Sequence, residues 1–216
     1  MKISVLQFPG TNCEYDTKYA FEQLGCEVEI IWHKEKNIPE DTDLLVIPGG
    51  FSYGDYLRSG AIARFATIMD SVQAYAAKGG KVLGICNGFQ ILLEAGLLPG
   101  AMKRNDSLHF ISKYHTLKVV NTDNTFLSLL NKDDVLNIPV AHHDGNYYID
   151  ANGLKELEDN NQILLKYCDK DGNLVNMNGS VSNIAGICNK EKNVFGLMPH
   201  PERAIEELLG STDGIN

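Results

Sequence analysis

The sequence predicts an α/β fold with a mostly parallel central sheet and helices on both faces. Short apolar segments of strand length alternate with segments of helical periodicity through the first half of the chain, an order typical of parallel sheets. Glycines follow the helical segments, as they do at helix ends. The segment Asp43–Ile47 ends in an unbroken apolar run, which is typical of a strand covered on both faces.

The first half is expected to contain four strands and three helices. The first expected helix begins after Cys13, where Asn12 is a candidate N-cap. The other two cover Ala61–Ala77 and Asn87–Ala95. Ligands bind at the carboxyl ends of strands in such sheets, so the loops after Ile47 and Ile85 are candidate site loops. The expected strands are Ile3–Gln7, Glu27–Trp32, Asp43–Ile47 and Lys81–Ile85.

The second half is less regular. The last two of its expected strands form a hairpin, and a final helix is expected from Pro201, because proline is favourable at the first helical position. No repeat or linker divides the chain, so we expect one domain over residues 1–216. The expected strands are Thr116–Val120, Asp134–Ala141, Gln162–Tyr167, Asn183–Cys188 and Val194–Met198.

The composition of the chain limits the classes of binding partner that we expect. The 216 residues are 44% hydrophobic, enough for a full core, and carry a formal net charge of −9. This charge repels phosphate backbones and anionic lipid, so we expect neither nucleic acid nor membrane as a partner. The amino-terminus has no signal-peptide pattern, and five scattered cysteines without a CxxC pair favour free thiols in a reducing cytoplasm.

Cys86 is the candidate nucleophile. Gly84 and Gly88 flank it in a G-x-C-x-G pattern between an apolar strand and a helix, the context of a nucleophile elbow. The helix dipole favours the thiolate form, and the backbone N–H of Asn87 is a candidate oxyanion donor. The alternative, a buried structural cysteine, is the simpler interpretation for the other four cysteines.

His200 is the best-placed base for a thiol nucleophile. It follows an apolar strand within M-P-H-P-E, and Glu202 is close enough in sequence to orient the imidazole. The alternative is a surface histidine beside a glutamate in the first turn of the helix. The spacing alone favours the two interpretations about equally. The rival cluster is His142, His143 and Asp144, for which a loop position at the site's rim or plain solvation is expected rather than a metal site.

The glycine-rich loop Pro48–Asp55 has three possible uses. It resembles phosphate-binding loops, but the chain contains no G-x-x-x-x-G-K-[ST] motif, so any ATP is expected on another chain. Its backbone near Gly50 is a candidate second oxyanion donor. The third use is a tight turn that simply needs glycine.

These motifs together resemble the triad-type, class I glutamine amidotransferases, and among them the small glutaminase subunits of phosphoribosylformylglycinamidine synthase. The resemblance covers nearly the whole chain and implies a flavodoxin-like amidotransferase architecture. The segments that show the resemblance are the G-x-C-x-G-x-Q run from Gly84 to Gln90, PGGFSYGDYLRSGAIA at Pro48–Ala63, IPVAHHDGNYY at Ile138–Tyr148, and GLMPHPERA around His200.

The resemblance also implies residue roles and partners. Cys86 would be the nucleophile, His200 the acid and base, and Glu202 its orienter. Glutamine is the implied substrate, and a large ATP-dependent synthetase subunit, with a further small subunit, is the implied assembly. No metal or cofactor is expected on this chain, since ATP and Mg²⁺ belong to the partner. Gly50 and Asn87 are the implied oxyanion donors, and Gln90 belongs to the glutamine pocket.

Two other interpretations stay open at this point. A cysteine α/β-hydrolase also uses G-x-C-x-G, but its acid precedes the histidine in the chain, whereas Glu202 follows His200. A regulatory module that kept the fold without catalysis is disfavoured because Cys86, His200 and Glu202 are all present.

Overall fold

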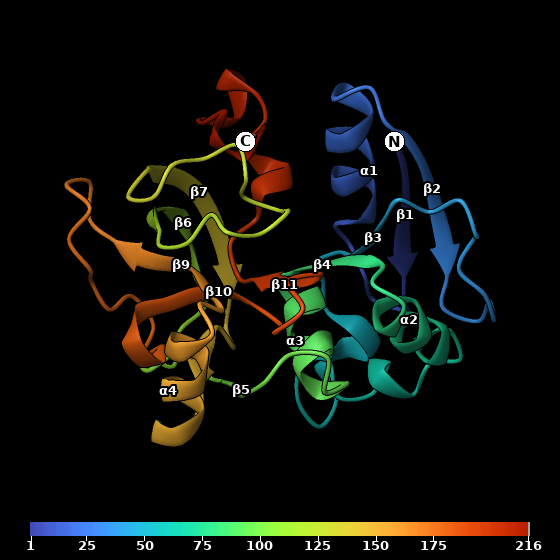
Figure 1. The fold of residues 1–216 in the computed structure, drawn as a ribbon, viewed down its shortest axis with the longest axis horizontal. Coiled ribbons are helices and arrows are strands. Elements are labelled where there is room, and N and C mark those ends of the chain that lie inside the picture. The colour runs from blue at the N-terminus through green and yellow to red at the C-terminus, as the bar shows by residue number, and fades with distance from the viewer. Residues whose placement is uncertain (216) are drawn as a thin grey trace.

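The computed structural model describes residues 1–215, and its main feature is a nine-stranded sheet in the order β2-β1-β3-β4-β11-β10-β9-β6-β7 (Figure 1). A separate pair is formed by β5 (Ala101–Lys103) and β8 (Asn146–Tyr148). The strands of the large sheet are β1 (Lys2–Gln7), β2 (Glu27–Trp32), β3 (Leu44–Ile47), β4 (Lys81–Ile85), β6 (Ile111–Val119), β7 (Val135–His142), β9 (Ile163–Cys168), β10 (Ile184–Cys188) and β11 (Val194–Leu197).

The sheet has a parallel block and an antiparallel block. Strands β2, β1, β3, β4 and β11 run parallel, as the alternating sequence of the first half predicts. The predicted hairpin is confirmed, because β10 pairs antiparallel with β11. Strands β9, β6 and β7 continue the sheet with antiparallel pairing. The fold is therefore a mixed, mostly parallel sheet.

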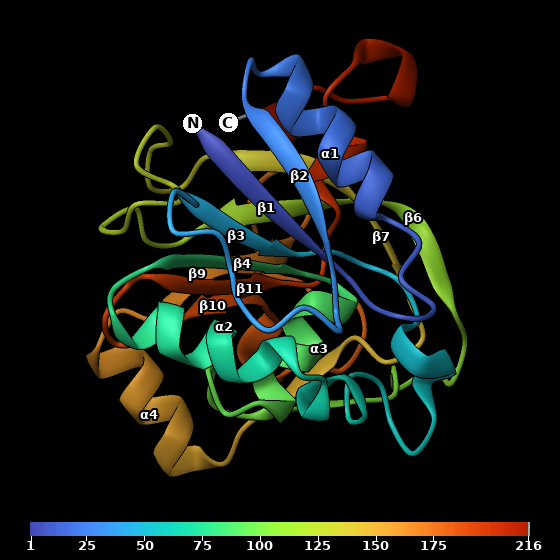
Figure 2. The same ribbon diagram turned by 90° about the vertical axis from the view of Figure 1, so that its right-hand side faces the viewer.

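Helices cover both faces of the sheet (Figure 2). Helix α1 (Glu14–Gln23) packs on one face, whereas α2 (Ile68–Ala77) and α3 (Asn87–Glu94) pack on the other. Helix α4 (Ala151–Asp159) follows β8. All four residues of β3 are buried, as its unbroken apolar sequence predicts.

Several local predictions are wrong or incomplete. The helix expected over Ala61–Ala77 begins only at Ile68, because Ala66 is extended (ψ 146°) after a short 3₁₀ turn. The helix expected from Pro201 is a single 3₁₀ turn ending at Arg203. Asn12 does not cap α1, since its side-chain oxygen accepts from the thiol of Cys13. Elements β5, β8 and α4 were not predicted.

The sheet curls so that its last strand returns to the centre. Strand β7 lies at the edge of the strand order, yet Pro139 on β7 accepts a hydrogen bond from the backbone of His200, 2.9 Å away, just after the central strand β11. The end of β7 therefore reaches the loops that follow β4 and β11. Within residues 1–215, no helix is both long enough and apolar enough to cross a bilayer.

Candidate active site

Four neighbouring parallel strands deliver the candidate residues to one edge of the sheet. Strands β1, β3, β4 and β11 are adjacent in the sheet, and their carboxyl ends lead to Cys13, the glycine loop, Cys86 and His200 respectively. The strand order thus brings together residues that are up to 187 positions apart (200 − 13) in the sequence. This is the edge at which ligands bind in open α/β sheets.

Cys86 occupies a strained turn between β4 and α3. Its φ of 50° and ψ of −103° lie outside the regions that L-residues favour, as expected for a nucleophile elbow. A Cβ on Gly88 would lie 1.8 Å from the carbonyl oxygen of Ile47, and one on Gly84 would lie 2.5 Å from Leu92. Both glycines are therefore required by close packing, which confirms the elbow geometry that the sequence predicts.

His200 and Glu202 form a buried pair. The imidazole Nδ1 lies 2.6 Å from Oε1 of Glu202, and both side chains are 2% exposed. This arrangement decides between the two interpretations of M-P-H-P-E, because a surface histidine is ruled out. Burial alone would lower the pKa of His200, but Glu202, Cys86 and Cys13 outweigh it and hold that pKa well above its ordinary value.

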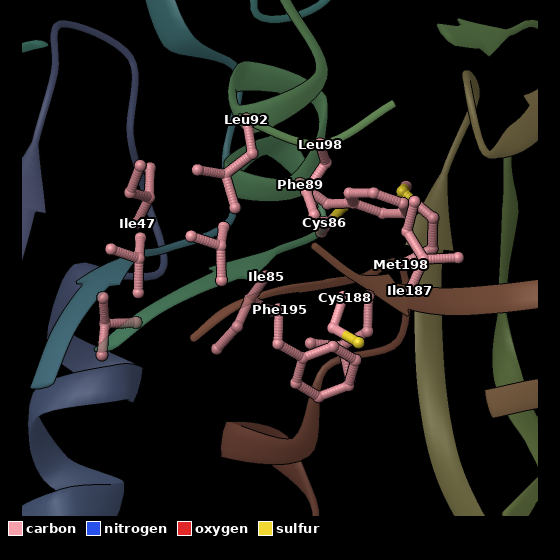
Figure 3. Close-up of a cluster of buried hydrophobic side chains, with 14 of the residues drawn as sticks. Ile47, Ile85, Cys86, Phe89, Leu92, Leu98, Ile187, Cys188, Phe195 and Met198 are labelled. Carbon is pink, nitrogen blue, oxygen red and sulfur yellow. The ribbon is translucent and has the colours of Figure 1, made fainter. Parts of the chain in front are cut away.

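The imidazole edge opposite Glu202 is free for chemistry. Nε2 of His200 is buried and has no hydrogen-bond partner in the part of the chain that the structure describes. The Cys86 thiol points to the carbonyl oxygen of Ala141, 3.7 Å away, and the residue is 5% exposed. Figure 3 shows Cys86 among buried apolar side chains, including Phe89 and Met198. The reacting groups are therefore shielded from water.

The glycine-rich loop passes directly over the imidazole. A Cβ on Gly49 would lie 2.7 Å from Cε1 of His200, so only glycine fits there. Gly50 adopts φ 144°, and a Cβ there would lie 2.7 Å from the backbone nitrogen of Asn12. Gly49 is therefore explained by its close approach to the imidazole, whereas Gly50 is explained by its φ and by its close approach to the loop after β1, as in a tight turn that needs glycine. The predicted oxyanion roles of Gly50 and Asn87 stay predictions.

The side chains of Asn87 and Gln90 brace the elbow. Asn87 accepts from the backbone N–H of Ser52 at 3.0 Å and donates to Oε1 of Gln90 at 2.8 Å. Gln90 in turn donates to the carbonyl oxygen of Asp144 at 2.7 Å. Both amides are buried. They tie the glycine-rich loop and the loop after β7 to the first turn of α3.

The chain matches known proteins along its full length. The profile of the CobB/CobQ-like glutamine amidotransferase domain family matches residues 1–212. The phosphoribosylformylglycinamidine synthase subunit PurQ of Sulfurimonas denitrificans is 70% identical over 215 residues, covering 100% of this chain and 96% of that protein. The subunit PurQ of Wolinella succinogenes is 63% identical over 214 residues, covering 99% and 96%. The chain belongs to the PurQ family of glutamine amidotransferases.

A solved structure supports the same fold. The structure of PurLQS from Thermotoga maritima superposes with a TM-score of 0.88 at 42% identity, covering 99% of this chain and 93% of the matched chain. The predicted amidotransferase architecture is therefore confirmed. Family membership also favours the amidotransferase interpretation over a cysteine α/β-hydrolase, in agreement with the position of Glu202 after His200.

Sequence reasoning missed a second cysteine behind the base. Cys13 is buried, and its sulfur accepts a hydrogen bond from Nη2 of Arg203 at 3.1 Å. Arg203 also pairs with Asp16 at 3.0 Å. Burial raises the pKa of the Cys13 thiol, so the sulfur stays neutral beside the pair. The only signal in the sequence was the position of Cys13 after β1, on the same edge as the elbow.

The same cluster has ligand types that metals prefer. Atoms of Cys13, His200 and Glu202 lie within 4.8 Å of one another. The guanidinium of Arg203 contacts the sulfur, however, and its positive charge opposes a metal ion there. The expectation that this chain holds no metal stays a prediction.

The rival histidine cluster divides into a buried and a half-buried residue. His142 is 3% exposed, so solvation is the wrong explanation for it, and its Nδ1 faces Oδ1 of Asn105 at 3.1 Å. Burial, followed by the charge of His200, lowers the pKa of His142 to about 4, which keeps it neutral. His143 lies at the rim and pairs with Asp144 at 3.1 Å.

Proposed function

We propose that this chain is the glutaminase subunit of a cytoplasmic phosphoribosylformylglycinamidine synthase, acting as a single domain over residues 1–216. It hydrolyses glutamine and delivers ammonia to a large ATP-dependent synthetase subunit, which converts formylglycinamide ribonucleotide to the amidine in purine biosynthesis. A further small subunit completes the assembly, and ATP and Mg²⁺ bind the large subunit. The observation that carries the proposal is the buried His200–Glu202 pair beside a strained cysteine elbow.

The first half of the reaction uses the elbow. The thiolate of Cys86 attacks the carboxamide carbon of glutamine, and the backbone N–H groups of Gly50 and Asn87 stabilise the oxyanion. His200 protonates the departing nitrogen, so ammonia leaves and a glutamyl thioester remains. Glu202 keeps the imidazole in the required orientation and stabilises the imidazolium, consistent with the raised pKa of His200.

The second half releases the product. His200, now neutral, removes a proton from water, which attacks the thioester and expels the Cys86 thiolate. Glutamate leaves and the ion pair is restored. Gln90 contributes to the glutamine pocket through its amide bridge to the loop after β7.

The buried site suggests that catalysis depends on docking. Cys86 is 5% and His200 2% exposed, so glutamine reaches the thiol only after a loop moves. The free subunit should therefore hydrolyse glutamine slowly, and docking on the synthetase should accelerate it. Equal rates of glutamine hydrolysis by the free chain and by the complex would contradict this coupling.

The test compares two nitrogen sources in the reconstituted complex. With Cys86→Ser, glutamine-dependent amidine synthesis should fall by roughly 10³-fold or more, because the covalent step is lost. Ammonia-dependent synthesis should keep its rate, since ammonia bypasses this chain. Cys26→Ser is the matched control at a half-buried cysteine outside the site. Retained glutamine-dependent synthesis in Cys86→Ser would refute the proposal.

A further inference from the structure

Two carboxylates lie together between the glycine-rich loop and the loop after β7. The hydroxyl of Ser59 donates to Oδ2 of Asp144 at 2.9 Å, and the other oxygen of Asp144 faces Nδ1 of His143 at 3.1 Å. Asp55 is close enough to Asp144 for their charges to interact. Its Oδ1 is buried and lacks a hydrogen-bond partner among residues 1–215. Both oxygens of Asp144 thus have a partner, whereas Oδ1 of Asp55 has none among these residues.

An unpartnered buried carboxylate oxygen is costly, so this position needs an explanation. Burial, followed by the charge of Asp144, raises the pKa of Asp55 to about 6, although Ser59 opposes the shift. The nearest arginine in sequence is engaged elsewhere, because Nε of Arg58 lies 2.6 Å from Oε1 of Glu94. The pair is therefore a negatively charged place that suits an added cation.

This acidic pair is tied directly to the nucleophile elbow. Asp144 is bound to the elbow through Gln90, and it lies three residues after Ala141, whose carbonyl contacts the Cys86 thiol. On the other side, the backbone of Ser52 binds Asn87, and Ser52 begins the turn that contains Asp55. The Ser52 hydroxyl is itself buried without a partner among the residues that the structure describes. Both unsatisfied groups, Oδ1 of Asp55 and the Ser52 hydroxyl, therefore lie in the one turn that is hydrogen-bonded to Asn87, the residue after the reacting thiol.

We propose that Asp55, supported by Asp144, binds the α-ammonium group of the substrate glutamine. This inference rests on the proposed function and adds the basis of substrate selection to it. Glutamine carries its carboxamide at one end, and at the other an α-carboxylate and an α-ammonium group that is protonated at neutral pH. With the carboxamide at Cys86, the ammonium supplies the partner that Asp55 lacks. A simple amide without the cation leaves Oδ1 of Asp55 without a partner.

The test uses a substrate without the ammonium group. Glutaramate is glutamine with hydrogen in place of the α-ammonium, so it retains the carboxamide and the carboxylate. In the reconstituted complex, Asp55→Asn should lower kcat/KM for L-glutamine by roughly 10- to 100-fold, the loss expected for one charge-assisted contact. It should leave kcat/KM for glutaramate nearly unchanged. The ratio of the two values is the readout, since a general structural defect lowers both.

Two controls separate this effect from loss of structure. Asp70→Asn makes the same charge change at an exposed position of α2 and should leave the ratio at its wild-type value. The rate at which iodoacetamide alkylates Cys86 reports on an intact elbow without any need for the ammonium. Asp144→Asn is a second variant. It should lower the ratio of kcat/KM for L-glutamine to that for glutaramate less than Asp55→Asn does, because Asp144 already has two partners.

Each outcome supports or overturns the inference. A ratio that collapses in Asp55→Asn with normal alkylation supports it. A wild-type ratio in Asp55→Asn, or an equal loss for both substrates, overturns it. If Asp55→Asn does not fold, an unchanged ratio in Asp144→Asn overturns the inference, and a reduced ratio supports it. Failure of the proposed function would show differently, as glutamine-dependent synthesis that survives Cys86→Ser.

Discussion

Cys86 is held by its immediate neighbours in the sequence, whereas His200 is held by distant segments. The elbow owes its shape to Gly84, Gly88 and the strand–helix junction around them. His200 is packed under Gly49, beside Cys13, and hydrogen-bonded through its backbone to Pro139 on β7. The turn that holds the nucleophile is therefore encoded mainly by local sequence, whereas the position of the base depends on tertiary contacts. Substitutions around Cys86 and substitutions around His200 should therefore differ in their effects on stability and activity.

The largest effect is expected from Glu202→Gln. Without the carboxylate that raises the pKa of His200, the imidazolium is less stable and glutamine-dependent kcat/KM should fall by roughly 10³-fold. Elbow alkylation by iodoacetamide measures whether Cys86 is still in place. The exposed Glu207→Gln is the matched control. An equal loss in both variants would contradict the assignment of Glu202.

Glu202→Gln should also change the pH dependence of stability. The pKa of His200 is higher in the folded state, so this pair stabilises the fold fully below the ordinary histidine pKa. That contribution is lost as the pH rises through the raised pKa. The difference in free energy of unfolding between wild type and Glu202→Gln should therefore shrink as the pH rises. A difference that grows with pH would break this explanation.

Gly88→Ala tests the packing of the elbow against β3. An alanine Cβ would overlap the backbone oxygen of Ile47, which cannot move without disturbing β3. We expect a loss of about 3 kcal/mol in the free energy of unfolding, measured by urea denaturation. Gly153→Ala is the matched helical control, because its Cβ would meet side-chain atoms of Ile149 and Asp150 rather than backbone. Equal stability of the two variants would contradict the close packing of the elbow.

His142→Gln tests a tertiary neighbour of the base. The pKa of His142 falls from 6.5 to about 4 on folding, so its neutral form stabilises the fold above pH 6.5 and this stability is lost as the pH falls. Acidification should cost wild type about 3 kcal/mol more than the variant. Urea denaturation at several pH values measures the difference. The exposed His109→Gln should follow wild type, and the same slope in all three proteins would refute the prediction.

The smallest effect is expected from Cys13→Ala. The sulfur stands beside the His200–Glu202 pair and binds Arg203, so its removal frees the guanidinium to compete for Glu202. We expect kcat to fall about 10-fold with little change in KM, and the pKa of His200 in the pH–rate profile to fall. Cys13→Ser should retain most activity, since a hydroxyl replaces both hydrogen bonds. Cys26→Ala is the control, and an unchanged pH profile in Cys13→Ala would contradict this role.

The accuracy of the sequence predictions follows the same division. The strands of the parallel block were predicted to within one residue because apolar runs or alternation bounded by turn residues are local signals. The start of α2 was placed too early, since periodicity continued through a segment that packs against α3 as a separate turn. The short β5 and β8 were missed because three-residue strands carry too little pattern.

The amino-acid sequence was sufficient to predict the elbow around Cys86 and the candidate roles of His200 and Glu202. The glycines, the strand–helix junction and the M-P-H-P-E motif lie within a few residues of the groups that they position. Only the tertiary structure decided that His200 and Glu202 are buried together, that Cys13 and Arg203 stand behind them, and that Asp55 meets Asp144. Those contacts depend on the strand order and on the curl that returns β7 to the centre, and neither is a local property of the chain.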